Sequence, residues 1–174
     1  MAKKACSALV KLNKMKIFYW FLFVLCIATK AQASSVEGCA AAEVTDSNGA
    51  TFSFWQHKFS GEARDLVMAQ VTSDAKRVTF DNFQGCAYQA LAIVEGVGWG
   101  WHLAWADKKN IYYSRMDGEA WVSSVPKKIT ANNVSDLHFT QEKSMLTLSW
   151  QADGASFSMQ SDDEGRSWQV PIKR

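Results

Sequence analysis

One turn near the C-terminus decides how this sequence is interpreted, because residues 161–168 read Ser-Asp-Asp-Glu-Gly-Arg-Ser-Trp. The spacing predicts a tight hairpin, since an aspartate side chain accepts backbone N–H bonds within such a turn. The glycine two residues later supplies a backbone position with positive φ. We therefore expect Ser161, Asp163, Gly165 and Trp168 to form the scaffold of the turn, with the tryptophan folded back to cover it.

A second, imperfect copy of this turn stands 47 residues earlier in the sequence. It has Ser114, Gly118 and Trp121 at the matching positions, while its aspartate, Asp117, comes one place late. The same step relates two segments that contain cysteine, Gly-Cys-Ala around Cys39 and Gly-Cys-Ala around Cys86, and one further step reaches Asn133. A shared step of this size indicates an internal repeat.

Each repeat unit also contains a segment that ends in tryptophan, followed by a second apolar run. These are Trp55 with residues 66–71, Trp105 with residues 111–115, and Trp150 with residues 157–160. Apolar residues alternate with small or polar ones in these segments, which predicts short β-strands.

The predicted fold is all-β, with units at 38–84, 85–131 and 132–174. A period of about 40–47 residues with about four antiparallel strands in each unit is typical of a propeller blade. Three blades form a half or partial β-propeller. The alternative is an ordinary β-sandwich in which the internal similarities are accidental.

The turn at 161–168 matches Ser-x-Asp-x-Gly-x-Ser/Thr-Trp, the Asp-box or BNR repeat, and the chain resembles the sialidase-like Asp-box β-propellers. The resemblance covers residues 85–174 well and 38–84 weakly, because the first unit retains only Thr-Ser-Asp at 72–74. In that family the boxes lie on the outer rim, away from the active site, so the resemblance implies a structural role. Asp117 to Trp121 is also similar to the Asp-Gly-x-x-Trp step of small propeller lectins.

The resemblance to sialidases does not extend to their catalytic residues. Those enzymes resemble one another in three arginines that clamp a carboxylate, a tyrosine nucleophile beside a glutamate, and an acidic acid/base residue. After residue 33 this chain has only five arginines, at positions 64, 77, 115, 166 and 174, and no Arg-Ile-Pro motif. We therefore expect a non-catalytic protein, with a sialidase-like glycosidase assembled across a dimer as one alternative.

The first 33 residues have the pattern of a secretory signal peptide. Residues 1–16 are rich in lysine, residues 17–28 are uncharged and mostly apolar, and Ala-Gln-Ala follows at 31–33. The apolar run is shorter than the roughly 20 residues that span a bilayer. We expect cleavage after Ala33, a start at Met1 or Met15, a working domain at 34–174 without a membrane span, and a secreted or periplasmic location.

The charge of the chain is concentrated in this leader. Six of the 19 Lys and Arg residues lie in it, so the remaining part has 13 against 17 Asp and Glu, a net charge near −4. A mildly acidic domain gives no support to nucleic-acid binding. Charged residues make up 21% and hydrophobic residues 48% of the sequence, which excludes a disordered chain.

Cys39 and Cys86 are the two cysteines that remain after the leader, and in an oxidising compartment we expect them to form one disulfide. Bridged Cα atoms must lie within about 7 Å, so both cysteines are expected on strands near the propeller axis. A metal site is the alternative, but His57, His102 and His138 lack ligand spacing and there is no Cys-x-x-Cys. We expect neither a metal nor an organic cofactor.

The segment from Glu95 to His102 is the candidate ligand site. Trp99 and Trp101 have no counterpart in the other units, and glycines flank them. Aromatic faces beside Glu95, His102 and Arg115 suit stacking on a sugar ring with hydrogen bonds to its hydroxyls. The alternative is that both tryptophans pack within a strand.

The sequence therefore predicts an exported, non-catalytic Asp-box repeat protein that binds a glycan or a protein partner. A periplasmic inhibitor or immunity protein is a further alternative, since small exported disulfide domains often block enzymes. Three blades also leave two sheet faces without a neighbour, so we expect a homodimer that completes six blades.

Overall fold

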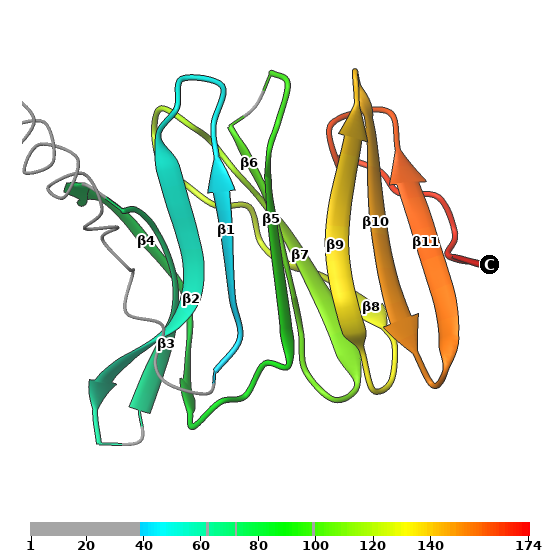
Figure 1. The fold of residues 1–174 in the computed structure, drawn as a ribbon, viewed down its shortest axis with the longest axis horizontal. Helices are drawn as coiled ribbons and strands as arrows, with labels where there is room; N and C mark the ends of the chain where they lie inside the picture. The colour runs from blue at the N-terminus through cyan, green and yellow to red at the C-terminus, as the bar shows by residue number, and fades with distance from the viewer. Residues whose placement is uncertain (1–38, 62, 72, 99) are drawn as a thin grey trace, which may run out of the picture. The chain divides into compact units, whose positions relative to one another are not determined.

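The computed structural model describes residues 39–61, 63–71, 73–98 and 100–174, and these residues form an all-β domain with three four-stranded antiparallel sheets (Figure 1). The predicted leader at 1–33 lies outside the described residues, and so does Trp99. The part of the chain that the structure describes contains no helix able to span a bilayer.

Each sheet is a simple meander that lies within one of the predicted repeat units. Sheet A has β1 Ala41–Thr45, β2 Thr51–Ser60, β3 Ala63–Gln70 and β4 Ser73–Gln84. Sheet B has β5 Ala90–Glu95, β6 Trp101–Ala106, β7 Asn110–Met116 and β8 Lys127–Thr130. Sheet C has β9 Ser135–Glu142, β10 Met145–Ala152, β11 Ala155–Ser161 and β12 Ile172–Lys173. The prediction of three antiparallel sheets is confirmed.

The first strands of the three sheets lie next to one another. Figure 1 shows β5 between β1 and β9, and β5 contacts both of them. Sheet B is therefore the middle sheet, with sheet A against one face and sheet C against the other. This arrangement of first strands is the one expected of neighbouring propeller blades, here in an open row that does not close into a ring.

The middle sheet is buried on both faces, which explains why every residue of β6 is buried. Trp101, Leu103 and Trp105 point into the core shared with sheet A, whereas Ala104 and Ala106 point into the core shared with sheet C. Alternation along a strand sends successive side chains to opposite faces.

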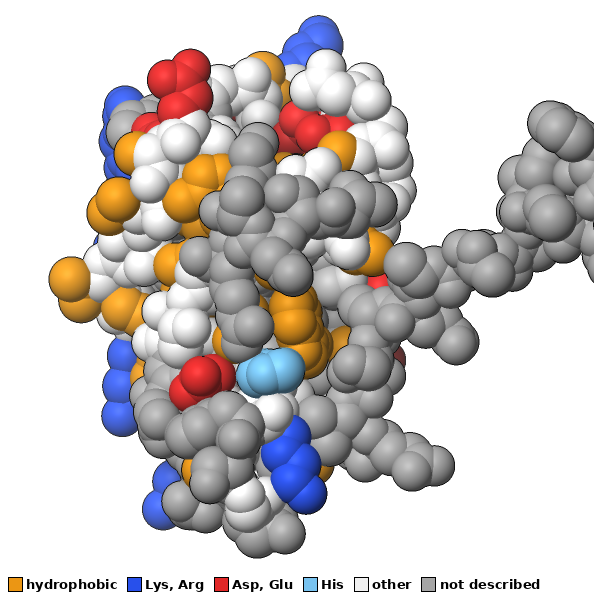
Figure 2. Space-filling model, turned by 90° about the vertical axis from the view of Figure 1, so that its left-hand side faces the viewer, with side chains coloured by type: hydrophobic (Ala, Val, Ile, Leu, Met, Phe, Trp, Pro, Cys, Tyr) orange, Lys and Arg blue, Asp and Glu red, His pale blue; other side chains and the backbone are white. Residues whose placement is uncertain are grey.

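The two outer faces of the row differ in chemistry. On sheet A, Trp55 and His57 lie on the face turned away from sheet B, with their rings edge to face at 6.2 Å, and Figure 2 shows hydrophobic side chains on that side of the domain. On sheet C, most outward side chains of β10 and β11 are polar, and two pairs of them bond to each other. Gln151 donates to Ser156 at 2.7 Å, and Gln160 donates to Thr147 at 3.3 Å.

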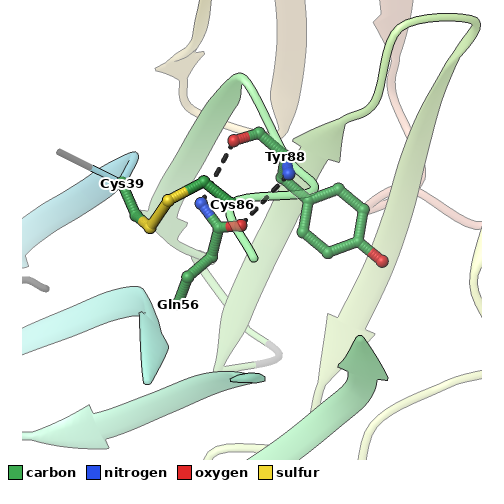
Figure 3. The surroundings of a disulfide bond; sticks show 4 residues. All are labelled: Cys39, Gln56, Cys86 and Tyr88. Carbon is green, nitrogen blue, oxygen red and sulfur yellow. Dashed lines mark hydrogen bonds between the residues drawn. A yellow bond between two sulfur atoms is a disulfide. The ribbon is translucent and has the colours of Figure 1, made fainter. Parts of the chain in front are cut away.

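Cys39 and Cys86 form the predicted disulfide, with their Cα atoms 5.4 Å apart (Figure 3). The expectation that both lie on strands is wrong: Cys39 precedes β1 and Cys86 lies in the connection before β5. Beside the bridge, the buried Gln56 side chain donates to the Tyr88 carbonyl and accepts from the Tyr88 N–H, each at 3.1 Å. The disulfide and the amide together attach the start of sheet B to sheet A.

The repeat positions of the three units meet at this end of the domain. Cys39, Cys86 and Asn133, which the step of 47 residues relates, line one open cavity of about 850 Å³. They lead into β1, β5 and β9, the three adjacent first strands. The three positions that the repeat makes equivalent in sequence therefore also lie close together in the folded domain.

Candidate functional site

The turn at 161–168 is organised around the carboxylate of Asp163. That carboxylate accepts hydrogen bonds from the Ser161 hydroxyl at 2.8 Å, the Ser167 N–H at 2.9 Å and the Ser167 hydroxyl at 2.7 Å. The bonds from Ser167 and Ser161 hold the pKa of the Asp163 carboxyl well below its usual range. Gly165 has φ 74°, so the positive φ predicted for it is confirmed.

In the second copy of the turn the aspartate also accepts backbone N–H groups, but from different positions. Asp117 accepts the N–H groups of Glu119 at 2.9 Å and Ala120 at 2.6 Å. Gly118 does not take a positive φ as Gly165 does; in this turn Trp121 takes that conformation, with φ 55°.

Both box tryptophans contact the preceding sheet. Trp168 of sheet C meets the ring of Tyr113 in sheet B edge to face, with centroids 4.9 Å apart. Trp121 of sheet B lies 5.9 Å from the ring of Phe52 in sheet A. The turns at 114–121 and 161–168, called the box turns below, therefore each pack their own sheet against the preceding one through a tryptophan ring.

A row of three polar side chains crosses the junction between sheets B and C beside the turn at 161–168. The fully buried ring of His102 lies between the Tyr113 hydroxyl, 2.8 Å from Nδ1, and the Glu164 carboxylate, 3.1 Å from Nε2. A carboxylate only accepts, so Nε2 carries the proton and donates to Glu164, and Tyr113 donates to Nδ1. The row is satisfied with a neutral imidazole.

Burial controls the titration of this row. It lowers the pKa of His102 below the usual 6.5, and the nearby charge of Arg115 acts in the same direction, while the bond to Glu164 opposes them. Burial also raises the pKa of Tyr113 well above its usual value of 10. Tyr113 therefore keeps its proton, and so does the hydrogen bond that it donates.

A small pocket with three cationic side chains opens next to this row. We call it the cationic pocket; its volume is about 240 Å³. Its lining residues come from β7, the β7–β8 connection, β8 and the box turn of sheet C: Tyr113, Arg115, Ser124, Val125, Lys127, Gly165 and Arg166. None of these described lining residues is an aspartate or a glutamate.

The acidic groups nearest in sequence to the cationic pocket are engaged elsewhere. Glu164 bonds to His102, and Asp163 bonds to Ser161 and Ser167 within the turn. The Lys127 ammonium donates to the Arg166 carbonyl at 2.6 Å, which holds β8 against the turn. The arrangement can accept an anionic group, because arginine and lysine donate charge-assisted hydrogen bonds to carboxylate, sulfate or phosphate oxygens.

The structure does not assemble the predicted ligand site as the sequence suggested. Trp101 is 4% exposed and its ring lies 4.3 Å from that of Phe52, so its face is not available to a sugar. Glu95 accepts hydrogen bonds from the Ser47 N–H and hydroxyl, at 2.7 and 3.0 Å, in the neighbouring sheet. Of the members of this site that the structure describes, only His102 and Arg115 come together, on the opposite face of sheet B from Trp101.

Sequence reasoning did not assign ligand roles to Tyr113, Lys127, Glu164 or Arg166. The signal available was alternation: Tyr113 and Arg115 are two residues apart and therefore share one face of a strand. The spacing within the box turn gave no indication that Glu164 and Arg166 face a neighbouring sheet.

No protein-family model matches this chain, and no curated protein is significantly similar to it. The Asp-box assignment therefore stays a prediction that rests on the residues at 85–174.

Proposed function

We propose that this chain is an exported, non-catalytic Asp-box repeat protein that binds an acidic glycan in the cationic pocket. The observation that carries the proposal is the convergence of Arg115, Lys127 and Arg166, from two sheets, on one pocket without a carboxylate among its described lining residues. An anionic substituent of the glycan, a carboxylate or a sulfate, would accept charge-assisted hydrogen bonds from these side chains.

A binding role agrees better with the neighbouring side chains than a catalytic one. Tyr113 is 2% exposed and burial favours its protonated form, which opposes a role as a nucleophile. Both ring nitrogens of His102 are engaged inside the protein, so neither is presented to a substrate. These groups position the pocket wall.

Export is supported by the lysine-rich leader pattern and by the disulfide. The Cys39–Cys86 bridge is of the kind that persists in oxidising compartments and is rare in the cytosol. A secreted or periplasmic location would also place the protein where acidic polysaccharides are accessible.

Calorimetric titration of residues 34–174 tests the proposal. The probes are an oligogalacturonate, a sialylated oligosaccharide and a sulfated oligosaccharide, with neutral maltohexaose as the control. Binding of at least one acidic probe that weakens with added salt supports the proposal. If none of the acidic probes binds in the millimolar range, the proposal is wrong.

The two adjacent lysines of β8 provide a matched pair of variants. Lys127 pairs with Tyr113 and lines the cationic pocket, whereas Lys128 pairs with Tyr112 and lies on the opposite face of the strand. Both are exposed. Lys127→Gln should lower the affinity for the acidic probe by about fivefold, and Lys128→Gln should leave it unchanged. An equal effect of both would indicate a general charge effect.

A further inference from the structure

The buried row of Tyr113, His102 and Glu164, which we call the His102 row, shares a wall with the cationic pocket. Tyr113 belongs to both, because it bonds to His102 and lines the pocket. Arg115 also lines the pocket, and it pairs with His102 across β6 and β7, which places both side chains on one face of sheet B. A charge that appears in the pocket therefore acts on the imidazole, and a charge on the imidazole acts on the pocket.

The His102 row has a place for one more proton. In the neutral row Nε2 donates to Glu164, and Nδ1 accepts from the Tyr113 hydroxyl. Nδ1 is therefore the atom that would take up a proton from solvent. The imidazolium formed in this way would face the Glu164 carboxylate across the existing distance of 3.1 Å, so the ion pair requires no rearrangement.

The groups around His102 act on its charge in opposite directions. Burial and the charge of Arg115 on β7 lower the pKa of the imidazole, whereas the bond to Glu164 of the box turn and its charge raise it. The described neighbours of His102 and Tyr113 in β5, in the β5–β6 connection and in β9 are uncharged: Val94, Gly96 and Phe139. The protonation of this imidazole therefore responds to whatever offsets the charge of Arg115.

An anion in the cationic pocket would do so. Its oxygens would accept from the guanidinium of Arg115, and a negative charge beside that cation favours the protonated imidazole. On protonation the Tyr113 hydroxyl accepts from Nδ1 and turns its own O–H away from His102. This hydroxyl lies against Gly165 in the pocket wall, so an anion in the pocket offers the O–H a new acceptor.

We propose that the cationic pocket binds its acidic ligand together with one proton, which Nδ1 of His102 takes up from solvent. This inference rests on the proposed function, since the ligand is the acidic glycan. The consequence is that the protein binds the glycan more tightly in a mildly acidic medium than at neutral pH and releases it as the pH rises. Because linkage is reciprocal, the bound glycan also holds the proton on the row.

Calorimetric titration of residues 34–174 with the sulfated oligosaccharide at pH 7.5 and at pH 5 tests this coupling. The sulfate groups stay ionised at both values, so a change in affinity comes from the protein. The affinity should be at least about fivefold higher at pH 5, which is the lower end of typical coupling between two sites. Titrations in two buffers of different ionisation enthalpy should show that the protein takes up protons when the probe binds.

Two variants separate the row from a general rise in positive charge, and the readout is the ratio of the affinities at the two pH values. His102→Gln removes the titrating ring. Glu164→Gln keeps the size of the side chain but removes the charge that stabilises the imidazolium. Both should bring the ratio close to one, whereas His138→Gln, at an exposed position, should leave it unchanged. Lys127→Gln should lower the affinity at both pH values and keep the ratio. Circular dichroism checks that each variant keeps the β fold.

Three results would overturn the proposal. The first is that the probe binds with equal affinity at both pH values, which would leave the proposed function standing. The second is that His102→Gln and Glu164→Gln keep the ratio of the parent while His138→Gln loses it, which would move the origin of the pH dependence to the surface. The third is that neither the sulfated probe nor the carboxylated ones bind at either pH, which would overturn the proposed function as well.

Discussion

The hydroxyl group of Tyr113 in sheet B lies directly against the backbone of Gly165 in the box turn of sheet C, where a Cβ atom would overlap it. Gly165 is therefore required for two reasons: its φ of 74° disfavours other residues, and its missing side chain makes room for the tyrosine. The contact joins the box turn, the His102 row and the wall of the cationic pocket.

Replacing this glycine tests the contact. Gly165→Ala should lower the free energy of unfolding more than Gly154→Ala does. Gly154 has a similar φ of 76°, but nothing lies within 4 Å of the position that its Cβ atom would take. The control should cost about 1–2 kcal/mol for the backbone conformation. Overlap with Tyr113 should add about 1–3 kcal/mol. Denaturant unfolding measures both, and Tyr113→Phe should recover part of the added loss. Equal losses for the two glycines would contradict the close contact.

The buried imidazole should make stability depend on pH. The pKa of His102 is lowered in the folded domain, so below about pH 6.5 the unfolded chain takes up a proton that the folded chain does not. The free energy of unfolding should therefore fall as the pH drops from 7 toward 5. His102→Gln should flatten this dependence and also cost about 1–3 kcal/mol at pH 7, because the Tyr113 hydroxyl loses its partner.

The exposed His138 provides the control for that series. Urea unfolding at several pH values, with His138→Gln in parallel, measures the slope for each variant. If His102→Gln keeps the slope of the parent while His138→Gln loses it, the buried row is not the origin of the pH dependence.

The sequence predicted best what depends on short spacing along the chain. The three sheets and the turn around Asp163 follow from the step of 47 residues and from residue types within a few positions of one another, whereas the disulfide followed from there being two cysteines after the leader. These features are set by local turn chemistry and strand alternation. Such spacing is visible before any folding is considered.

The ligand site was predicted poorly because it depends on which faces the neighbouring sheets cover. Trp101 and His102 are adjacent in β6 and so point to opposite faces of sheet B, and both side chains are buried because each face is covered by a neighbouring sheet. Glu164 meets His102 across 62 residues, and nothing in the local spacing encodes that contact. The contact between Glu164 and His102 forms because sheet C packs against this face of sheet B.

The disulfide should contribute about 4 kcal/mol to stability. Its two cysteines are separated by 47 residues, and closing a loop of that length removes this much entropy from the unfolded chain. The double variant Cys39→Ser, Cys86→Ser should lose this amount in denaturant unfolding, and the parent protein after reduction should behave similarly. A loss below about 1 kcal/mol would show that the Gln56–Tyr88 bonds hold this end of the domain without the bridge.

The oligomeric state depends on the outward face of sheet C. A six-bladed ring made from two copies would press that face against the outward face of sheet A of the other copy. The two junctions inside the chain bury rings and aliphatic side chains, whereas β10 and β11 turn Ser, Thr and Gln side chains outward and satisfy them by mutual bonds, including Gln151 to Ser156. Such a face gains little from burial. In contrast to the six-bladed homodimer that the sequence led us to expect, this face favours a monomer, and we expect residues 34–174 to be monomeric in light scattering at micromolar concentration. A dimer that dissociates in Gln151→Arg but persists in the exposed control Gln169→Arg would instead show that this face closes the ring.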